Sequence, residues 1–287
     1  MTASLMPARL PGGAGLGFRR ELIAELQAGV PAGIDFFELA PENWAGMGGR
    51  SGRQLRALTE RHPFVCHGLS LSLGGPAPLD VTLLRRIRQF MDEHGIGLYT
   101  EHLSWCADDS HLYELLPIPF SEAAVQWTAG RIRQAQDMLG RRIGIENASY
   151  YIAPPGAEMS ETEFISAIVA EADCLLHLDV NNIYVNSCNF AFDPLSFLHA
   201  LPLERTCYVH VAGHYVEPDG LLVDTHGAEV IDPVWTLLAA AYERIGGDVP
   251  TCLERDFNIP DLAQLTAEVG QIARLQAAAP QRQRQVA

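Results

Sequence analysis

Short apolar runs alternate with longer amphipathic segments along the whole chain. The apolar runs are typical of buried strands and cover residues 15–18, 34–39, 64–70, 97–102, 143–147, 175–181, 207–212 and 251–255. The intervening segments carry apolar residues at helical spacing and predict helices over residues 21–27, 53–61, 80–94, 121–139, 160–172, 193–200, 233–245 and 260–278. This alternation predicts an α/β protein built on a parallel sheet.

Ionisable residues stand at the ends of nearly all of these apolar runs. They are Glu38, Glu42, His67, Glu101, His102, Glu146, Asp179, His210, His214 and Glu254. In an open doubly wound sheet, ligands gather at one switch point, so only a few strand ends carry chemistry. In a closed barrel, all strand ends converge on one face. The pattern therefore predicts a (β/α)8 TIM barrel with a functional site at its mouth.

Length and composition fit a single barrel domain. A chain of 287 residues, 48% of them hydrophobic, can bury a large core, and it contains no internal repeat or low-complexity linker. We expect a flexible N-terminal segment over residues 1–14, the catalytic barrel over residues 15–278 and a flexible tail over residues 279–287.

Charge and hydropathy argue against two classes of partner. The formal net charge of −15 disfavours nucleic acid, which binds basic surfaces. No apolar run is long enough to span a bilayer, and the N-terminus lacks the apolar stretch of a signal peptide. We therefore expect a cytoplasmic protein without a membrane partner.

The polar residues at the strand ends form a candidate metal-binding set. Buried ionisable groups are costly unless they are paired or bind a metal. The candidate ligands are His67, His102, Glu146, Asp179, His210, Asp224, His226 and Glu254, with Asn181 and His214 as further candidates. A set made only of nitrogen and oxygen ligands suits iron, manganese or zinc rather than a zinc–thiolate site. The set contains more ligands than one metal ion binds, which suggests two or three ions.

Other residues have simpler interpretations. A lone histidine in a strand or helix is more often structural than functional, and we expect this for His62, His94, His111 and His199. His177 precedes Asp179 by two positions, so it should lie deeper and support the ligands. Aromatic residues beyond the strand ends either line a substrate groove or pack the rim; they are Trp44, Trp105, Tyr150, Tyr151 and Tyr184.

Nine short motifs, in order along the chain, resemble those of the DUF692 family. They are Pro41-Glu42-Asn43, His67-Gly68-Leu69-Ser70-Leu71-Ser72, Glu101-His102-Leu103-Ser104-Trp105, Leu115-Leu116-Pro117, Ile145-Glu146-Asn147, Leu178-Asp179-Val180-Asn181-Asn182-Ile183-Tyr184-Val185, His210-Val211-Ala212-Gly213-His214, Asp224-Thr225-His226 and Glu254-Arg255-Asp256-Phe257-Asn258-Ile259-Pro260. The similarity runs from about Gly15 to Leu275. This family comprises multinuclear non-haem iron-dependent oxidative enzymes related to the methanobactin biosynthesis oxidase.

The resemblance implies a xylose-isomerase-like TIM barrel that holds two or three irons in a mixed Fe(II)/Fe(III) state. It implies that O₂ is used to modify cysteine residues of a ribosomally made precursor peptide, for example by oxazolone or thiooxazole formation. A copper-binding peptide is the favoured product, and a partner protein that binds the leader is expected.

The resemblance also assigns residues. The implied iron ligands are His67, His102, Glu146, Asp179, Asn181, His210, Asp224, His226 and Glu254. Asp256 and Glu42 are candidates for proton transfer near the substrate, and His214 is a further catalytic candidate. Glu101 stands where many relatives carry Asp, which conserves the charge. The segment Ser187-Cys188-Asn189-Phe190 departs from the commoner pattern and leaves the choice of substrate open.

Two alternatives remain at this point. The same scaffold carries redox-inert isomerases and hydrolases that use Zn²⁺ or Mn²⁺ to polarise a carbonyl or generate hydroxide. A non-catalytic metal-binding protein would bind metal without consuming O₂. Metal content and O₂ uptake separate the three.

Overall fold

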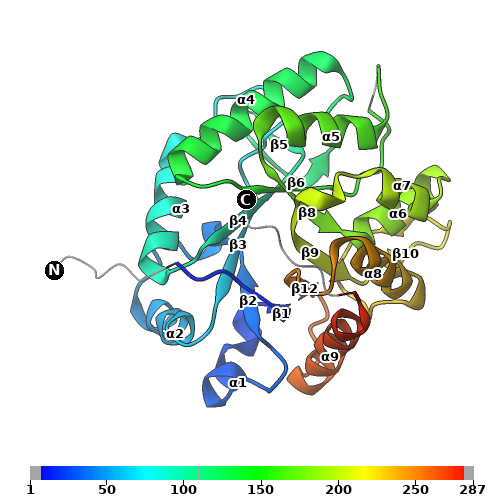
Figure 1. The fold of residues 1–287 in the computed structure, drawn as a ribbon. Coiled ribbons are helices and arrows are strands. Elements are labelled where there is room, and N and C mark those ends of the chain that lie inside the picture. Colours follow the sequence, from blue (N-terminus) through cyan, green and yellow to red (C-terminus); the bar gives the residue numbers. More distant parts are fainter. Residues whose placement is uncertain (1–7, 109, 155, 281–287) are drawn as a thin grey trace.

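A closed parallel barrel forms the centre of the molecule and confirms the predicted TIM-barrel fold (Figure 1). The computed structural model describes residues 8–108, 110–154 and 156–280. Within them, eight strands pair in chain order and β12 closes the barrel against β1. The strands are β1 (Ala14–Gly17), β2 (Phe36–Leu39), β3 (Phe64–Gly68), β4 (Leu98–His102), β7 (Gly144–Glu146), β8 (Leu175–Asp179), β9 (Thr206–Ala212) and β12 (Thr251–Glu254).

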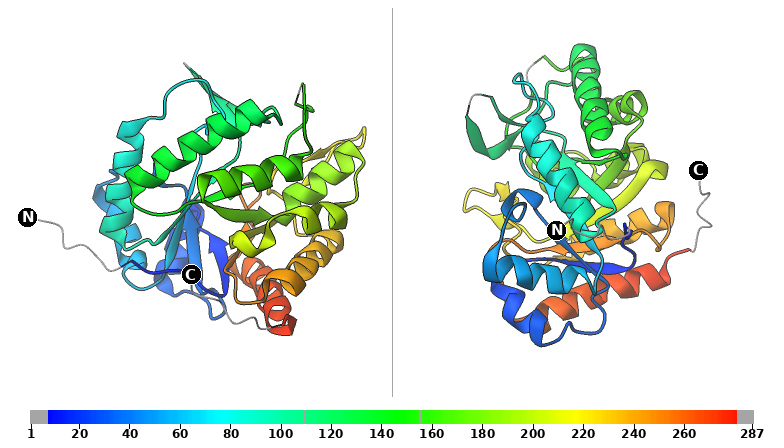
Figure 2. Two further views of the ribbon diagram at one scale, coloured as in Figure 1. Left: turned by 45° about the horizontal axis from the view of Figure 1, so that its top comes forward. Right: turned by 90° about the vertical axis from the view of Figure 1, so that its left-hand side faces the viewer.

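Helices surround the barrel, as the amphipathic segments predict (Figures 1 and 2). They are α1 (Ile23–Ala28), α2 (Gly49–Thr59), α3 (Val81–His94), α4 (Glu122–Leu139), α5 (Glu161–Ala172), α6 (Val180–Phe190), α7 (Pro194–Ala200), α8 (Asp232–Ile245) and α9 (Leu262–Ala278). Short 3-10 helices lie at η1 (Arg20–Leu22), η2 (Pro41–Asn43) and η3 (Leu203–Arg205). In the part of the chain that the structure describes, no helix is long and apolar enough to cross a membrane.

Helix α6 was not predicted, and the strand predicted over residues 175–181 ends early. Asp179 is the last residue of β8 and also the N-cap of α6, where its side chain accepts a hydrogen bond from the Asn182 N–H. The segment after it is rich in asparagine and β-branched residues, which have low helix propensity. Its helical state therefore depends on the cap and on burial of Val180 and Ile183.

Two hairpins, also not predicted, extend from the loops after β4 and β9. The first pairs β5 (Trp105–Ala107) with β6 (His111–Leu116), and the second pairs β10 (Tyr215–Val216) with β11 (Leu222–Val223). Figure 2 (right) shows both hairpins on the same side of the barrel. They lie at the mouth, because each follows the carboxyl end of a barrel strand.

The barrel interior is layered by the two-residue period of its strands. A lower apolar layer is formed by Phe36, Val65, Leu98, Tyr208 and Cys252. Gly15 leaves room for this layer, because a Cβ there would lie 2.4 Å from the Phe36 ring. Two residues further along the same strands, and therefore on the same inner face, stand Glu38, His67, Thr100, His210 and Glu254. The apolar layer thus forms the floor beneath a polar layer at the mouth.

The predicted flexible ends are only partly within the described residues. Residues 1–7 and 281–287 lie outside them. Arg9 is described, and its backbone N–H donates to Gly95 O at 2.9 Å. The boundaries of the barrel domain remain a prediction, although β1 begins at Ala14 and α9 ends at Ala278.

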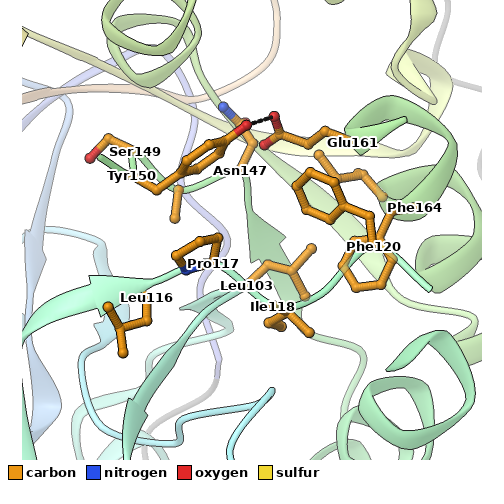
Figure 3. A pocket seen from close by; sticks show the side chains of 12 residues that line it. Leu103, Leu116, Pro117, Ile118, Phe120, Asn147, Ser149, Tyr150, Glu161 and Phe164 are labelled. Carbon is orange, nitrogen blue, oxygen red and sulfur yellow. Dashed lines mark hydrogen bonds between the residues drawn. The ribbon is translucent and has the colours of Figure 1, made fainter. Parts of the chain in front are cut away.

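A partly buried carboxyl lies outside the barrel, at the start of α5. Glu161 Oε2 accepts a hydrogen bond from the Tyr150 O–H at 2.7 Å, beside the apolar side chains of Phe120 and Phe164 (Figure 3). Burial raises the pKa of Glu161 from 4.5 to about 7, since desolvation disfavours the charged form.

This raised pKa predicts a pH-dependent contribution to stability. Between pH 4.5 and about 7 the unfolded chain ionises at Glu161 while the folded chain keeps the proton, so stability decreases as pH rises through this window. We expect the free energy of unfolding of the wild type, relative to that of Glu161→Gln, to fall across it. Urea unfolding at both ends of the window measures this difference, and a constant value would contradict the prediction.

Candidate metal centre

Two histidines and a glutamate from neighbouring strands meet at one side of the mouth. His67 Nε2 lies 3.2 Å from Glu146 Oε2 and 3.2 Å from His102 Nε2, and His102 Nε2 lies 3.3 Å from the same carboxylate oxygen. Strands β3, β4 and β7 are consecutive neighbours in the barrel, which brings the three side chains together. Their distances and atom types match the face of a metal coordination sphere.

The other ring nitrogens of this pair are held by groups outside the cluster. His102 Nδ1 lies 3.0 Å from Gly68 O, and a carbonyl oxygen can only accept, so Nδ1 carries the hydrogen. His67 Nδ1 lies 2.8 Å from Thr100 Oγ1. Metal-bound histidines are usually fixed in this way through the nitrogen that does not bind the metal. Both Nε2 atoms therefore face Glu146 Oε2.

His210 occupies the centre of the polar layer. Its Nε2 lies 2.6 Å from Glu38 Oε2 and donates to this carboxylate. Its Nδ1 faces three further carboxylates, at 3.1 Å from Glu254, 3.2 Å from Glu146 and 3.8 Å from Asp179. A ring nitrogen whose lone pair faces three anions requires a proton or a cation between them.

A third group lies on the opposite side of His210. His226 Nε2 lies 2.7 Å from Asp224 Oδ1, and its Nδ1 lies 3.2 Å from Glu254 Oε2 and 3.1 Å from Asp256 Oδ2. Asn181 Nδ2 donates to Asp224 Oδ1 at 2.7 Å. His226 has φ of 49°, so the loop turns at this residue. The turn brings the two side chains into direct contact.

The predicted ligand set is therefore brought together at the mouth. His67, Glu146, His177 and His210 offer atoms that all lie within 4.8 Å of one another, and so do Asp179, His226 and Glu254. The members of these groups come from strands spread around the barrel and from one loop. The two groups could hold more than one metal ion, and Glu146 and Glu254 would be among the residues that hold them.

Buried oxygen atoms without partners fit this interpretation. Glu146 Oε2 and Asp179 Oδ2 are buried and accept no hydrogen bond within the described residues. An unsatisfied buried oxygen of this kind is costly, and it is satisfied if a cation binds there. The buried histidines and carboxylates are therefore suited to binding metal ions.

The charges of the cluster act strongly on one another. Burial opposes the charged form of His210, yet the carboxylates of Glu38 and Glu254 raise its pKa well above the usual range. Burial likewise opposes ionisation of Glu146, but His177, His67 and His102 bring its pKa well below the usual value. Burial and the neighbouring charge of Glu146 raise the pKa of Asp179. Strong mutual shifts of this kind are typical of functional sites.

His177 is a member of the first group, whereas we predicted that it would only support the ligands from a deeper position. It is fully buried and packs edge-on against His210 at a ring distance of 4.1 Å. Burial and the charge of His210 lower its pKa well below the usual value. Its Nε2 lies 3.8 Å from Glu146 Oε1, and neither ring nitrogen has a hydrogen-bond partner in the part of the chain that is described.

The three catalytic candidates lie around the rim. Glu42 Oε1 accepts from the Leu69 N–H at 2.8 Å, and burial followed by the charge of Glu101 raises its pKa to about 7. Asp256 binds Arg19 as well as His226. His214 Nδ1 lies 2.9 Å from Asn181 Oδ1. Whether any of them transfers protons remains a prediction.

The aromatic residues divide between the two predicted roles. Trp44 is buried and packs against Phe18. Tyr150 is buried at Glu161, and Tyr184 lies 5.4 Å from the His214 ring. Tyr151 is half-exposed, and its hydroxyl oxygen accepts from the Asp224 N–H at 3.0 Å.

An open cavity of about 460 Å³ gives access to the centre. Glu38, His67 and Glu254 lie at its inner end, and Arg19, Asp256 and Phe257 contribute to its sides. Access from solvent is what a site that acts on a large substrate requires.

The candidate ligand set omitted Glu38, although its position at a strand end is visible in the sequence. The alternation of Phe36 and Glu38 on β2 places both inside the barrel. This could have been inferred from the two-residue period, because Phe37 and Leu39 contribute to the layer between barrel and helices.

These features define a TIM barrel with a candidate metal centre at the carboxyl ends of its strands. Residues 13–277 match the model of the RiPP precursor modification enzymes MbnB/TglH/ChrH, and the chain belongs to this family. A UPF0276 protein from Nitrosospira multiformis is 62% identical over 92% of this chain and 93% of its own length. A UPF0276 protein from Shewanella amazonensis is 56% identical over 93% of this chain and 95% of its own length.

Solved structures share the fold at low sequence identity. D-psicose 3-epimerase from Clostridium cellulolyticum aligns with a TM-score of 0.61 and 10% identity, covering 93% of this chain and 96% of that one. Endonuclease IV from Thermus thermophilus aligns with a TM-score of 0.57 and 19% identity, covering 93% of this chain and 98% of that one. These matches support the xylose-isomerase-like barrel and nothing finer.

The contact between Glu38 and His210 leads to a prediction about metal affinity. Because Glu38 holds the Nε2–H of His210, it should keep Nδ1 directed at the carboxylates. Loss of such an outer partner lowers metal affinity by roughly 10- to 100-fold. We expect Glu38→Ala to show this loss in chelator competition with Zn²⁺, and Glu161→Gln, which alters a glutamate outside the ligand groups, to bind as the wild type does. Equal affinity in the two variants would contradict the prediction.

Proposed function

We propose that this protein is an iron-dependent oxidase that uses O₂ to modify cysteine residues of a ribosomally synthesised precursor peptide. The observation that carries the proposal is the set of nitrogen and oxygen ligands around His210, in a chain whose family modifies such precursors. Two or three irons in a mixed Fe(II)/Fe(III) state are proposed. Their ligands would be His67, His102, Glu146, Asp179, Asn181, His210, Asp224, His226 and Glu254.

The donor chemistry supports iron. Imidazole and carboxylate ligands suit Fe, Mn and Zn, and the two ligand groups described above contain only these donors, whereas a third potential group, Glu38, His210 and Cys252, includes a thiol. Bound iron would supply a site for the substrate thiolate and the electrons for O₂ reduction. The cysteine residue is then oxidised, and O₂ is reduced.

The residues of the chain would hold the reactants and handle protons. Glu42, with a pKa raised to about 7, is suited to exchanging a proton near neutral pH. Asp256 is tied to Arg19 and His226 and would fix the position of the His226 ring. His214 and Asn181, in contact with each other, border the third ligand group. These roles are part of the proposal.

The proposed partner, location and product follow from the substrate class. The precursor carries cysteine, and a separate protein that binds its leader is proposed as a partner. A ribosomal precursor is made in the cytoplasm, where we place the reaction. A copper-binding peptide with oxazolone or thiooxazole groups is the proposed product.

Metal analysis of anaerobically purified protein tests the proposal first. We expect two or three irons per chain and their loss in His102→Ala and His226→Ala, because each variant removes a central ligand. His199→Ala, on the exposed surface of α7, is the matched control and should keep its iron. Zinc or manganese instead of iron, with no O₂ uptake after iron is added, would support a redox-inert isomerase or hydrolase.

A further inference from the structure

A shallow apolar cleft lies between the two hairpins at the mouth of the barrel. Its volume is about 310 Å³, at the lower end of the range for ligand pockets. One wall consists of residues of β6 and the residue after it, and the other of residues of the β10–β11 hairpin. The lining residues are Glu114, Leu115, Leu116, Pro117, Tyr151, Ile152, Leu221 and Val223.

The register of the second hairpin extends this surface. Tyr215 on β10 pairs directly with Val223 on β11, and directly opposed residues in an antiparallel pair lie on the same face. Leu221 and Val223, two positions apart, share that face as well. The exposed apolar surface therefore includes Tyr215, which is 51% exposed, and Ile152, which is 66% exposed.

The cleft lies next to Asp224, a candidate ligand at the metal centre. Val223 is followed directly by Asp224, whose backbone N–H donates to the Tyr151 hydroxyl at 3.0 Å. The side chain of Asp224 accepts from the Ser149 hydroxyl at 2.9 Å and lies 2.7 Å from His226. A peptide residue that reaches the metal centre near Asp224 would therefore have its neighbours within reach of this cleft.

We propose that the cleft between the hairpins binds an extended, apolar segment of the precursor peptide, next to the residue that is modified. This inference rests on the proposed function and adds the site and the chemistry of substrate selection. The lining is aliphatic and aromatic except for Glu114. It would therefore select apolar side chains and disfavour acidic ones.

A larger apolar groove elsewhere does not fit this role. It has a volume of about 540 Å³ and lies between α5 and α7, with Phe192 and Phe197 among its lining residues. None of the residues that line it belongs to the ligand groups. The cleft between the hairpins is smaller, but it lies beside Asp224, so a bound segment there remains connected to the reacting residue.

Short synthetic peptides labelled with fluorescein test the inference. Each carries one central cysteine, flanked either by leucine and valine or by serine and glutamine. Fluorescence anisotropy with anaerobic, metal-loaded protein gives the dissociation constants. Burying one aliphatic side chain contributes about 1.5–3 kcal/mol, so we expect the wild type to bind the apolar-flanked peptide at least about 10-fold more tightly.

Charged substitutions in the cleft should remove this preference. Leu221→Asp and Ile152→Asp place a carboxylate among apolar residues that are already exposed, so the barrel should fold normally. Leu195→Asp is the matched control, because Leu195 on α7 is 40% exposed and Leu221 is 39% exposed. We expect the control to keep the preference and its iron.

The outcomes separate this inference from the proposed function. No difference between the two peptides in the wild type, or an unchanged preference in both cleft variants, would overturn the cleft as the binding site. Loss of preference in the cleft variants supports it even if the wild type holds zinc and oxidises no cysteine. That last result would refute the oxidase and leave a peptide-binding enzyme of another chemistry.

Discussion

The mouth of this barrel buries five carboxyl groups close to one another and to several histidine rings. Glu38, Glu146, Asp179, Asp224 and Glu254 all have side chains that are at most 9% exposed. The arginine at the edge of this set, Arg19, is shared between Glu254 and Asp256. Burying unpaired charge is costly, so the arrangement is stable only with protonated histidines or with bound cations. The apolar floor of the barrel excludes water from below, so the charges at the mouth must be balanced by histidines or bound cations.

The same two-residue period that fills the barrel also places the ligands. On β2, β3, β9 and β12, an apolar residue of the floor is followed two positions later by a ligand or its support. The floor keeps water from the lower side of the cluster and strengthens its electrostatics. A single insertion in one of these strands would turn its polar residue out of the barrel. The ligand geometry is therefore set mainly by the strands and less by the loops at the rim.

The barrel and most of the cluster could be predicted from the sequence, because both depend on local patterns within the strands. Apolar runs ending in acids and histidines are local patterns, and closure of the barrel brings them together. The parts that could not be predicted depend on tertiary contacts. Helix α6 has poor intrinsic propensity and depends on the Asp179 cap. The role of Glu38 depends on His210, a residue far away in the chain, at 2.6 Å. The short β10–β11 pairing has only two residues per strand.

The difference between this chain and the epimerases and endonuclease of the same fold should therefore lie in the loops. At low identity the barrel itself carries no information about substrate. In this protein, the loops after β4 and β9 form hairpins whose apolar faces meet beside Asp224. A sugar or a DNA backbone would meet few hydrogen-bond donors on such a surface, whereas aliphatic peptide side chains would be desolvated there. If the proposed roles hold, metal binding by the strands and substrate selection by the loops are separate parts of the molecule, and the second can change without disturbing the first.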